Sequence, residues 1–154
     1  MKQLIPLTIG IGAIAGLRSM AAPAIISRAA RRKAFRIRDS RLKFLQSNKA
    51  GVVLSALAVG EMVADKLPFT PNRTSPGLLA GRVASGSLCG AVVSSAARRS
   101  VALGALFGGI GAVAGSFAGY QLRRKISKKL PPLSIAAAED ALTLTGGLAL
   151  ASLV

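Results

Sequence analysis

The sequence predicts an all-α membrane protein in which four or five transmembrane helices pack through glycine and alanine faces. Of the 154 residues, 51% are hydrophobic, only 4% are aromatic and 17 are glycine. Soluble domains rarely combine these features, whereas helices in lipid use small residues to approach one another closely. Strongly basic segments also alternate with long apolar runs, which is the charge pattern that orients membrane helices. We therefore expect one multi-pass domain over residues 1–154.

Five apolar segments are candidates for these helices. The first, residues 4–27, contains 24 residues, and at 1.5 Å per residue it is long enough to cross a hydrocarbon core of ~30 Å. A cleaved signal peptide ending near Ser19 is the alternative for this segment, but Arg18 and the basic residues that follow argue against export. The other four segments are residues 50–67, 77–97, 100–122 and 134–154.

Two basic segments separate the apolar runs. Residues 28–49 hold nine Lys and Arg residues against one acid, and residues 123–129 hold five more. We expect both to contact anionic lipid headgroups, and we expect residues 28–49 to face the cytoplasm. A nucleic-acid-binding protein is the other class with a net charge of +16, but it would not need five apolar segments. No nucleic-acid partner is therefore predicted.

The basic residues conflict with a simple count of five crossings. If Arg98 and Arg99 face the cytoplasm with both basic loops, residues 100–122 must enter and leave on the same side. If these arginines lie outside, one of the two preceding segments does not fully span. A broken or re-entrant segment is one solution, allowed where it is buried or lines a cavity. Residues 50–76 are a candidate by their prolines and acids, and residues 104–119 by their glycines; a tolerated violation is the remaining alternative.

Glycines four residues apart recur along the apolar segments. In membrane helices this spacing forms a face of small residues that packs closely against a neighbouring helix. The pattern does not separate packing within one subunit from self-association, so a homo-oligomer stays open. The glycines assigned to packing are Gly12, Gly16, Gly86, Gly90, Gly104, Gly108, Gly111, Gly115 and Gly119.

Charged residues inside the apolar segments are the candidates for function. Four of the five acids lie inside these segments or at their ends, and so do two arginines; one more arginine lies in a proline-rich connector. Each such charge costs about 2.5–3.5 kcal/mol on insertion scales, so these residues are expected to pair or to face water. The candidates are Glu61, Asp65, Glu139, Asp140, Arg18, Arg82 and Arg73.

Two functions fit these charges. In the first, the carboxylates form a pathway for a cation, a proton or a small polar solute: Glu61 and Asp65 bind or relay it, while Glu139 and Asp140 close the site. In the second, the charges form a buried ion-pair network in a non-transporting membrane scaffold or accessory subunit. An enzyme is not predicted, because without histidine no Ser-His-Asp arrangement exists. With a single cysteine as well, no metal or other cofactor is predicted.

A series of short motifs also resembles a known family. The motifs are Gly16-Leu17-Arg18-Ser19-Met20 with Pro23, Glu61-x-x-x-Asp65-Lys66-Leu67-Pro68-x-x-Pro71-x-Arg73-Thr74-x-Pro76, Arg82 with Gly86 and Gly90, Gly119-Tyr120-x-Leu122-Arg123, and Glu139-Asp140. In this order they resemble an uncharacterised family of small bacterial integral membrane proteins, the domain of unknown function 4126. The resemblance covers nearly the whole chain and implies a multi-pass protein of the bacterial inner (cytoplasmic) membrane. It implies no activity, substrate or catalytic residue.

Overall fold

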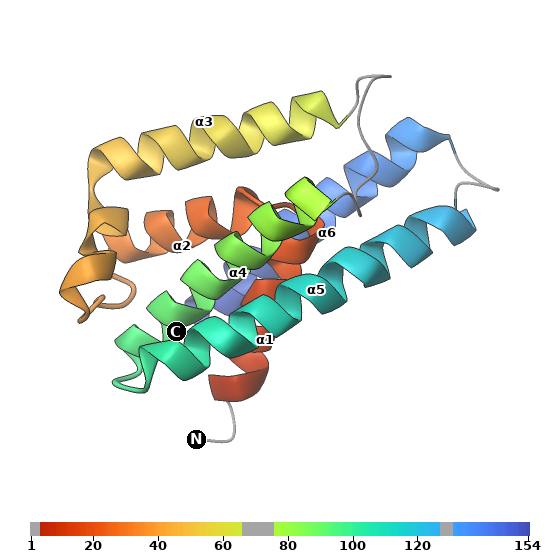
Figure 1. Cartoon of the computed structure of the whole chain (residues 1–154). Coiled ribbons are helices and arrows are strands. Elements are labelled where there is room, and N and C mark those ends of the chain that lie inside the picture. Colours follow the sequence, from red (N-terminus) through yellow and green to blue (C-terminus); the bar gives the residue numbers. More distant parts are fainter. Residues whose placement is uncertain (1–3, 66–75, 127–130) are drawn as a thin grey trace.

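The computed structural model describes residues 4–65, 76–126 and 131–154, and these residues form helices and connecting turns without a β-strand (Figure 1). An all-helical fold satisfies each backbone hydrogen bond within one segment, as lipid requires. The helices are α1 (Leu4–Leu17), α2 (Ala21–Arg31), the 3₁₀ helix η1 (Ser40–Gln46), α3 (Asn48–Ala64), α4 (Pro76–Ala96), α5 (Val101–Ile126) and α6 (Pro132–Ser152). The prediction of an all-helical fold is therefore confirmed.

Three of these helices, α4, α5 and α6, are long and apolar enough to cross a membrane, and α1 is a shorter apolar helix. They match the predicted segments 77–97, 100–122 and 134–154 closely. Helix α3, which covers most of the predicted segment 50–67, has 17 residues, a length of about 26 Å at the usual rise. Its Val52, Val59 and Val63 side chains are each more than half exposed, as expected for side chains that face lipid. The three long helices indicate a membrane location.

The prediction of one spanning helix over residues 4–27 is wrong. The chain leaves helical geometry at Arg18-Ser19-Met20 and starts again at Ala21. Pro23 is a physical reason, because proline lacks a backbone N–H and is tolerated only in the first turn of a helix. The two halves are about 21 and 17 Å long at the usual rise, so neither alone crosses a ~30 Å core. The broken segment is therefore residues 4–31.

Of the two segments that we expected to break, residues 104–119 are part of an unbroken helix, α5. Helix α3 is continuous to Ala64, and the rest of the 50–76 candidate, residues 66–75, lies outside the described residues. The glycines of α5 serve close packing instead of a break, since an apolar helix tolerates glycine where a neighbour approaches.

Helix α1 packs closely against α5, and α4 packs against the same glycine-rich stretch of α5 (Figure 1). A Cβ atom added at Gly12 would overlap the carbonyl oxygen of Gly108, and one added at Gly108 would overlap that of Gly86. Gly90 and Gly104 meet in the same way. Because only hydrogen fits at these positions, the backbones of three helices approach one another within a single chain.

The other assigned glycines extend this packing along α5. A Cβ added at Gly111 would overlap the backbone of Ile9, and one added at Gly115 would overlap that of Ala13. A Cβ added at Gly16 would overlap the backbone of Ala112. At Gly119 it would lie 2.8 Å from Cδ2 of Leu17 and 3.4 Å from Oε1 of Glu139. The glycine stripe thus leads from the middle of α5 to the point where α1 ends.

One end of the molecule brings together the start of α1 and the end of α6, and we name it the terminal end. A small cavity of about 120 Å³ lies there, lined by residues from the start of α1, the end of α4 and the end of α6. The hydroxyl oxygen of Ser95, near the end of α4, accepts hydrogen bonds from the backbone N–H groups of Arg38 and Asp39. Residues 32–47 therefore also lie at this end, opposite the end where α5 runs into Arg123 and α6 begins.

Helices α1 and α2 run away from one tip toward the same end of the molecule, and for this path we name them the re-entrant pair. Helix α1 runs from the terminal end alongside α5, whereas α2 runs back toward the terminal end (Figure 1). The direction of α2 follows from its contacts with α3: Met20 at its start lies beside Glu61, and Arg31 at its end packs over Gly51. The pair thus enters and leaves at the same end, with its tip at Arg18-Ser19-Met20.

The structure leaves the conflict over the basic residues in place, because α5 carries Arg123, the first residue of the second basic segment, to the end opposite Arg98 and Arg99. Arg98 and Arg99 lie at the terminal end, together with residues 28–49, and α5 crosses to the opposite end. The two basic segments also differ from simple loops. Within 28–49 the side chains of Phe35, Ile37 and Leu45 are buried, and within 123–129 the first four residues belong to α5; residues 127–129 lie outside the described residues.

Candidate functional site

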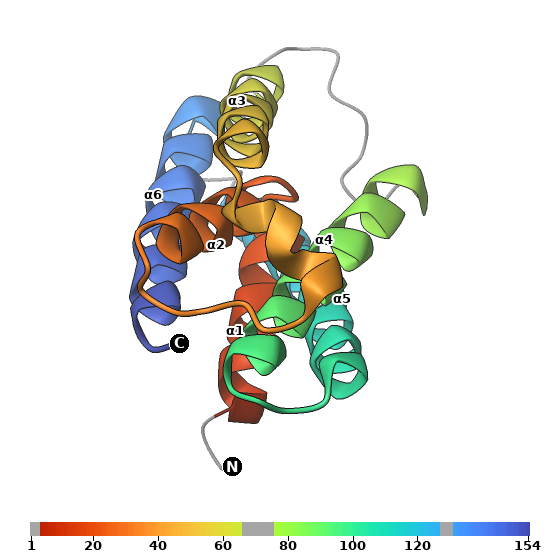
Figure 2. The ribbon, with the colours of Figure 1, turned by 90° about the vertical axis from the view of Figure 1, so that its left-hand side faces the viewer.

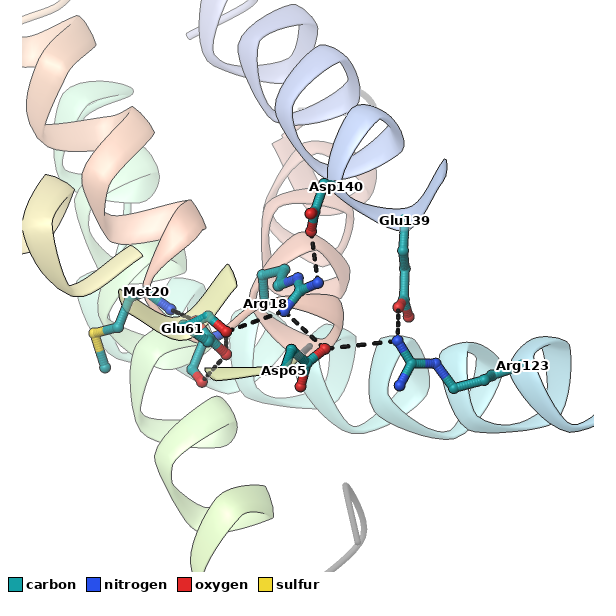
Figure 3. Close-up of polar contacts among 8 residues, drawn as sticks. Arg18, Met20, Glu61, Asp65, Arg123, Glu139 and Asp140 are labelled. Atoms are coloured by element: carbon teal, nitrogen blue, oxygen red, sulfur yellow. Dashed lines mark hydrogen bonds and ion pairs between the residues drawn. The ribbon is translucent and has the colours of Figure 1, made fainter. Parts of the chain in front are cut away.

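Arg18 is the central residue of a buried charged cluster at the tip of the re-entrant pair. Its side chain is only 1% exposed. Nη1 lies 2.8 Å from Oδ2 of Asp65 at the end of α3, and Nη2 lies 2.5 Å from Oδ1 of Asp140 on α6 (Figure 3). One arginine therefore joins the break between α1 and α2 to two other helices.

Glu61 binds the two residues that lead into α2. Its Oε1 accepts hydrogen bonds from the backbone N–H and the hydroxyl of Ser19, at 2.8 and 2.7 Å, and its Oε2 accepts one from the Met20 N–H at 2.8 Å (Figure 3). No side-chain hydrogen bond comes from Met20, the residue at the N-cap position itself. Helix N-termini leave N–H groups without partners and favour negative charge. A distant carboxylate thus stabilises the break in the chain.

The geometry of Glu61 gives a direct prediction about stability. A Glu61→Ala variant should lose about 1–2 kcal/mol of unfolding free energy, which is the usual cost of losing a helix cap. Glu61→Gln should lose less, because its amide oxygen can still accept one of the bonds that the carboxylate accepts. Unfolding can be followed in detergent with a thiol-reactive dye, since Cys89 is a single cysteine that is 1% exposed. Equal losses for the two variants would contradict the capping role.

Arg123 extends the cluster toward the end of α5. Its Nη2 lies 3.0 Å from Oε2 of Glu139, to which it donates a hydrogen bond, and 3.6 Å from Oδ2 of Asp65. The Arg123 side chain is 31% exposed, whereas Glu139 and Asp65 are 7% and 9% exposed. A continuous chain of ion pairs therefore runs from Asp140 through Arg18, Asp65 and Arg123 to Glu139.

The structure brings five of the seven candidate residues together: Arg18, Glu61, Asp65, Glu139 and Asp140. Arg82 is also buried, on α4, whereas Arg73 lies outside the described residues. The sequence interpretation missed Arg123, because it was assigned to a basic loop. Its spacing was a usable signal, since Arg123 follows Gly119 by four residues and so shares the face of α5 that packs inward.

The cluster is rich in carboxylate oxygens, which could in principle bind a metal ion, but these oxygens lie in the geometry of ion pairs. Within the three described ranges, no group of three His, Cys, Asp or Glu residues is placed to hold a metal ion. The carboxylates instead meet guanidinium groups or helix N–H groups. The arrangement can redistribute charge by exchanging partners among these arginines and carboxylates.

Comparison with known proteins identifies the family but no activity. No curated protein and no solved structure matches the chain. A sequence model of the family described as Domain of unknown function (DUF4126) matches residues 5–153. That match spans the re-entrant pair, the charged cluster and all three long apolar helices, and it confirms the resemblance noted in the motifs. The chain therefore belongs to the DUF4126 family.

Proposed function

We propose that this protein contains a gated membrane pathway for a proton, a cation or a small polar solute, with the charged cluster as its closed gate. The observation that carries the proposal is the tip of the re-entrant pair, where buried Arg18 meets Asp65 and Asp140. Re-entrant segments occur in membranes where they are buried in protein or line a cavity. Transporters place the ends of such half-helices at the binding site.

The contacts of Arg18 suggest how the gate works. Arg18 is divided between two carboxylates on different helices, so it can stay with one while the other is released. An entering cation or proton that neutralises Asp140 would remove one of its attractions and loosen α6 from the tip. Buried ion pairs suit this role, since two arrangements of the same charges can differ little in free energy.

The charge distribution also orients the proposed pathway. The terminal end holds residues 28–49 and Arg98-Arg99, whereas the opposite end holds fewer basic residues in the sequence. By the positive-inside rule, the terminal end faces the cytoplasm when the protein lies in a bacterial inner membrane. In that orientation α3, α4, α5 and α6 cross the membrane, and the gate lies in its outer part, reached by the re-entrant pair from the cytoplasm.

A structural role is the second candidate, because the carboxylates of the cluster already have partners. Both oxygens of Glu61 accept hydrogen bonds from Ser19 and Met20, just before α2. Asp65 and Asp140 share Arg18, and Glu139 pairs with Arg123. In this case the cluster locks the helices of a membrane scaffold in register and nothing moves through it.

Water access in sealed vesicles separates the two candidates. In a Cys89→Ala background, single cysteines replace Ala22, which is 1% exposed just beyond the tip, or Ala15, which is 0% exposed in the core. A membrane-impermeant thiol reagent then reports access from each side. For a gate, adding Asp140→Asn should raise labelling at position 22 at least tenfold and leave position 15 protected. A parallel rise at both positions, or no rise at either, would favour the structural lock.

A further inference from the structure

A second feature, separate from the charged cluster, is an apolar groove between α2, α3 and α6. Its volume is about 370 Å³, within the range of pockets that hold small molecules. Ala58 lies buried at its floor, and Val59, Met62, Leu144 and Leu148 give it an aliphatic surface. We name it the α2–α3–α6 groove. Figure 2 shows these three helices side by side along one flank of the molecule.

The groove is not uniformly apolar, because Arg28 and Arg32 line it as well. They are four residues apart at the end of α2, so they share one helix face. Two positive charges at this spacing repel each other, and a bound anion would relieve that repulsion. Both side chains are exposed and lie toward the terminal end. The groove therefore has an apolar body and a positive mouth.

A similar pattern recurs on the other side of the molecule. A cavity of about 290 Å³ between α1, α4 and α5 is lined by Leu4, Ile5, Leu103 and Phe107, with Arg99 at the terminal end. Arginine thus borders an apolar surface at the same end in two places. A charged side chain in a membrane protein prefers the level of the lipid headgroups, and the apolar surface next to it then lies at the level of the acyl chains.

We propose that the α2–α3–α6 groove binds one anionic diacyl phospholipid. An acyl chain lies along Ala58 and Leu148, and the phosphate is held at the mouth by Arg28 and Arg32. Charge complementarity selects this occupant, since a zwitterionic lipid brings a cation together with its phosphate to the two arginines and an uncharged lipid brings no anion. The site is distinct from the charged cluster and does not depend on the proposed pathway.

The test uses the full chain in a zwitterionic detergent with three probes: phosphatidylglycerol, phosphatidylcholine with the same acyl chains, and glycerol 3-phosphate. Binding is read by native mass spectrometry and by the temperature at which Cys89 becomes reactive. We expect phosphatidylglycerol to remain bound and to raise that temperature, and the other two to have little effect. Equal effects of the two lipids, or an equal effect of glycerol 3-phosphate, would overturn the proposal.

Variants locate the site. Because each arginine near a lipid surface contributes roughly a fivefold change in binding, Arg28→Gln/Arg32→Gln should weaken phosphatidylglycerol binding about 25-fold. The matched control Arg41→Gln/Lys43→Gln removes the same charge from exposed positions of η1 and should change binding less than about threefold. Equal losses would mean diffuse attraction to the basic segment, and the groove proposal would fail.

A third variant tests the groove itself without changing any charge. Ala58→Leu should fill its floor and reduce phosphatidylglycerol binding at least tenfold, while Cys89 stays protected in the folded protein. Unchanged binding in folded Ala58→Leu would place the lipid elsewhere. If light scattering instead shows a dimer that Ala58→Leu dissociates, a second copy of the chain occupies the groove and the lipid proposal is overturned.

Discussion

Replacing Arg18 with methionine is expected to lower the free energy of unfolding by about 3–5 kcal/mol, the usual cost of removing one member of a buried ion pair. The reason is that Arg18 is 1% exposed and lies against Asp65 and Asp140, so its removal takes away a counter-charge of both carboxylates. The loss can be measured as earlier reaction of Cys89 with a thiol dye during a denaturant titration in detergent.

A matched variant shows whether the loss comes from charge. Arg18→Met combined with Asp65→Asn and Asp140→Asn removes the arginine and both carboxylates together, and it should recover most of the stability, because neutral replacements of similar volume are tolerated in buried ion-pair networks. If the triple variant is as unstable as Arg18→Met, the packing of the arginine side chain matters more than its charge.

Replacing Gly108 with leucine should prevent stable folding, an effect larger than the 1–3 kcal/mol typical of overpacked cores. A side chain at this position would overlap the carbonyl of Gly86, and backbone atoms cannot move aside as a flexible side chain can. The bundle of α1, α4 and α5 would have to separate along its closest contact. The readout is the yield of folded protein with Cys89 protected from the thiol dye.

Gly60→Leu is the control for this substitution. Gly60 lies on α3, where an added Cβ would have no described neighbour within 4 Å, and leucine is a better helix former than glycine by up to about 1 kcal/mol. The Gly60 variant should therefore fold as well as the natural protein. A folded Gly108→Leu protein, or equal damage from both variants, would show that the glycine contact does not determine the packing.

The parts of the fold that the sequence predicted are those determined by local composition. Helices α4, α5 and α6 are continuous apolar runs long enough to span, so hydropathy alone located them. The close packing along α5 agrees with the spacing of its glycines, since a small-residue face has the same meaning in most membrane helices. The break at Arg18 was missed because the apolar run continues across it. Pro23, two residues after the start of α2, was the local signal.

The charged cluster depends on contacts that the sequence does not contain. Nothing local links Arg18 to Asp140, because they lie on the first and last parts of the chain, and only the folded arrangement selects this pair. The pairing of Glu61 with the N–H groups of Ser19 and Met20 was likewise hidden. Sequence reasoning could place these acids at membrane depth, but a carboxylate at that depth has several chemically equivalent partners.

The distance along the chain between Arg18 and Asp140 has a consequence for biosynthesis. Helix α6 is synthesised after the helices that surround the tip of the re-entrant pair, so until then the tip lacks Asp140, one of its two carboxylate partners. Contacts between such remote residues form late, after the intervening chain has been ordered. The first apolar run therefore completes its contacts at Arg18 only after α6 has been made.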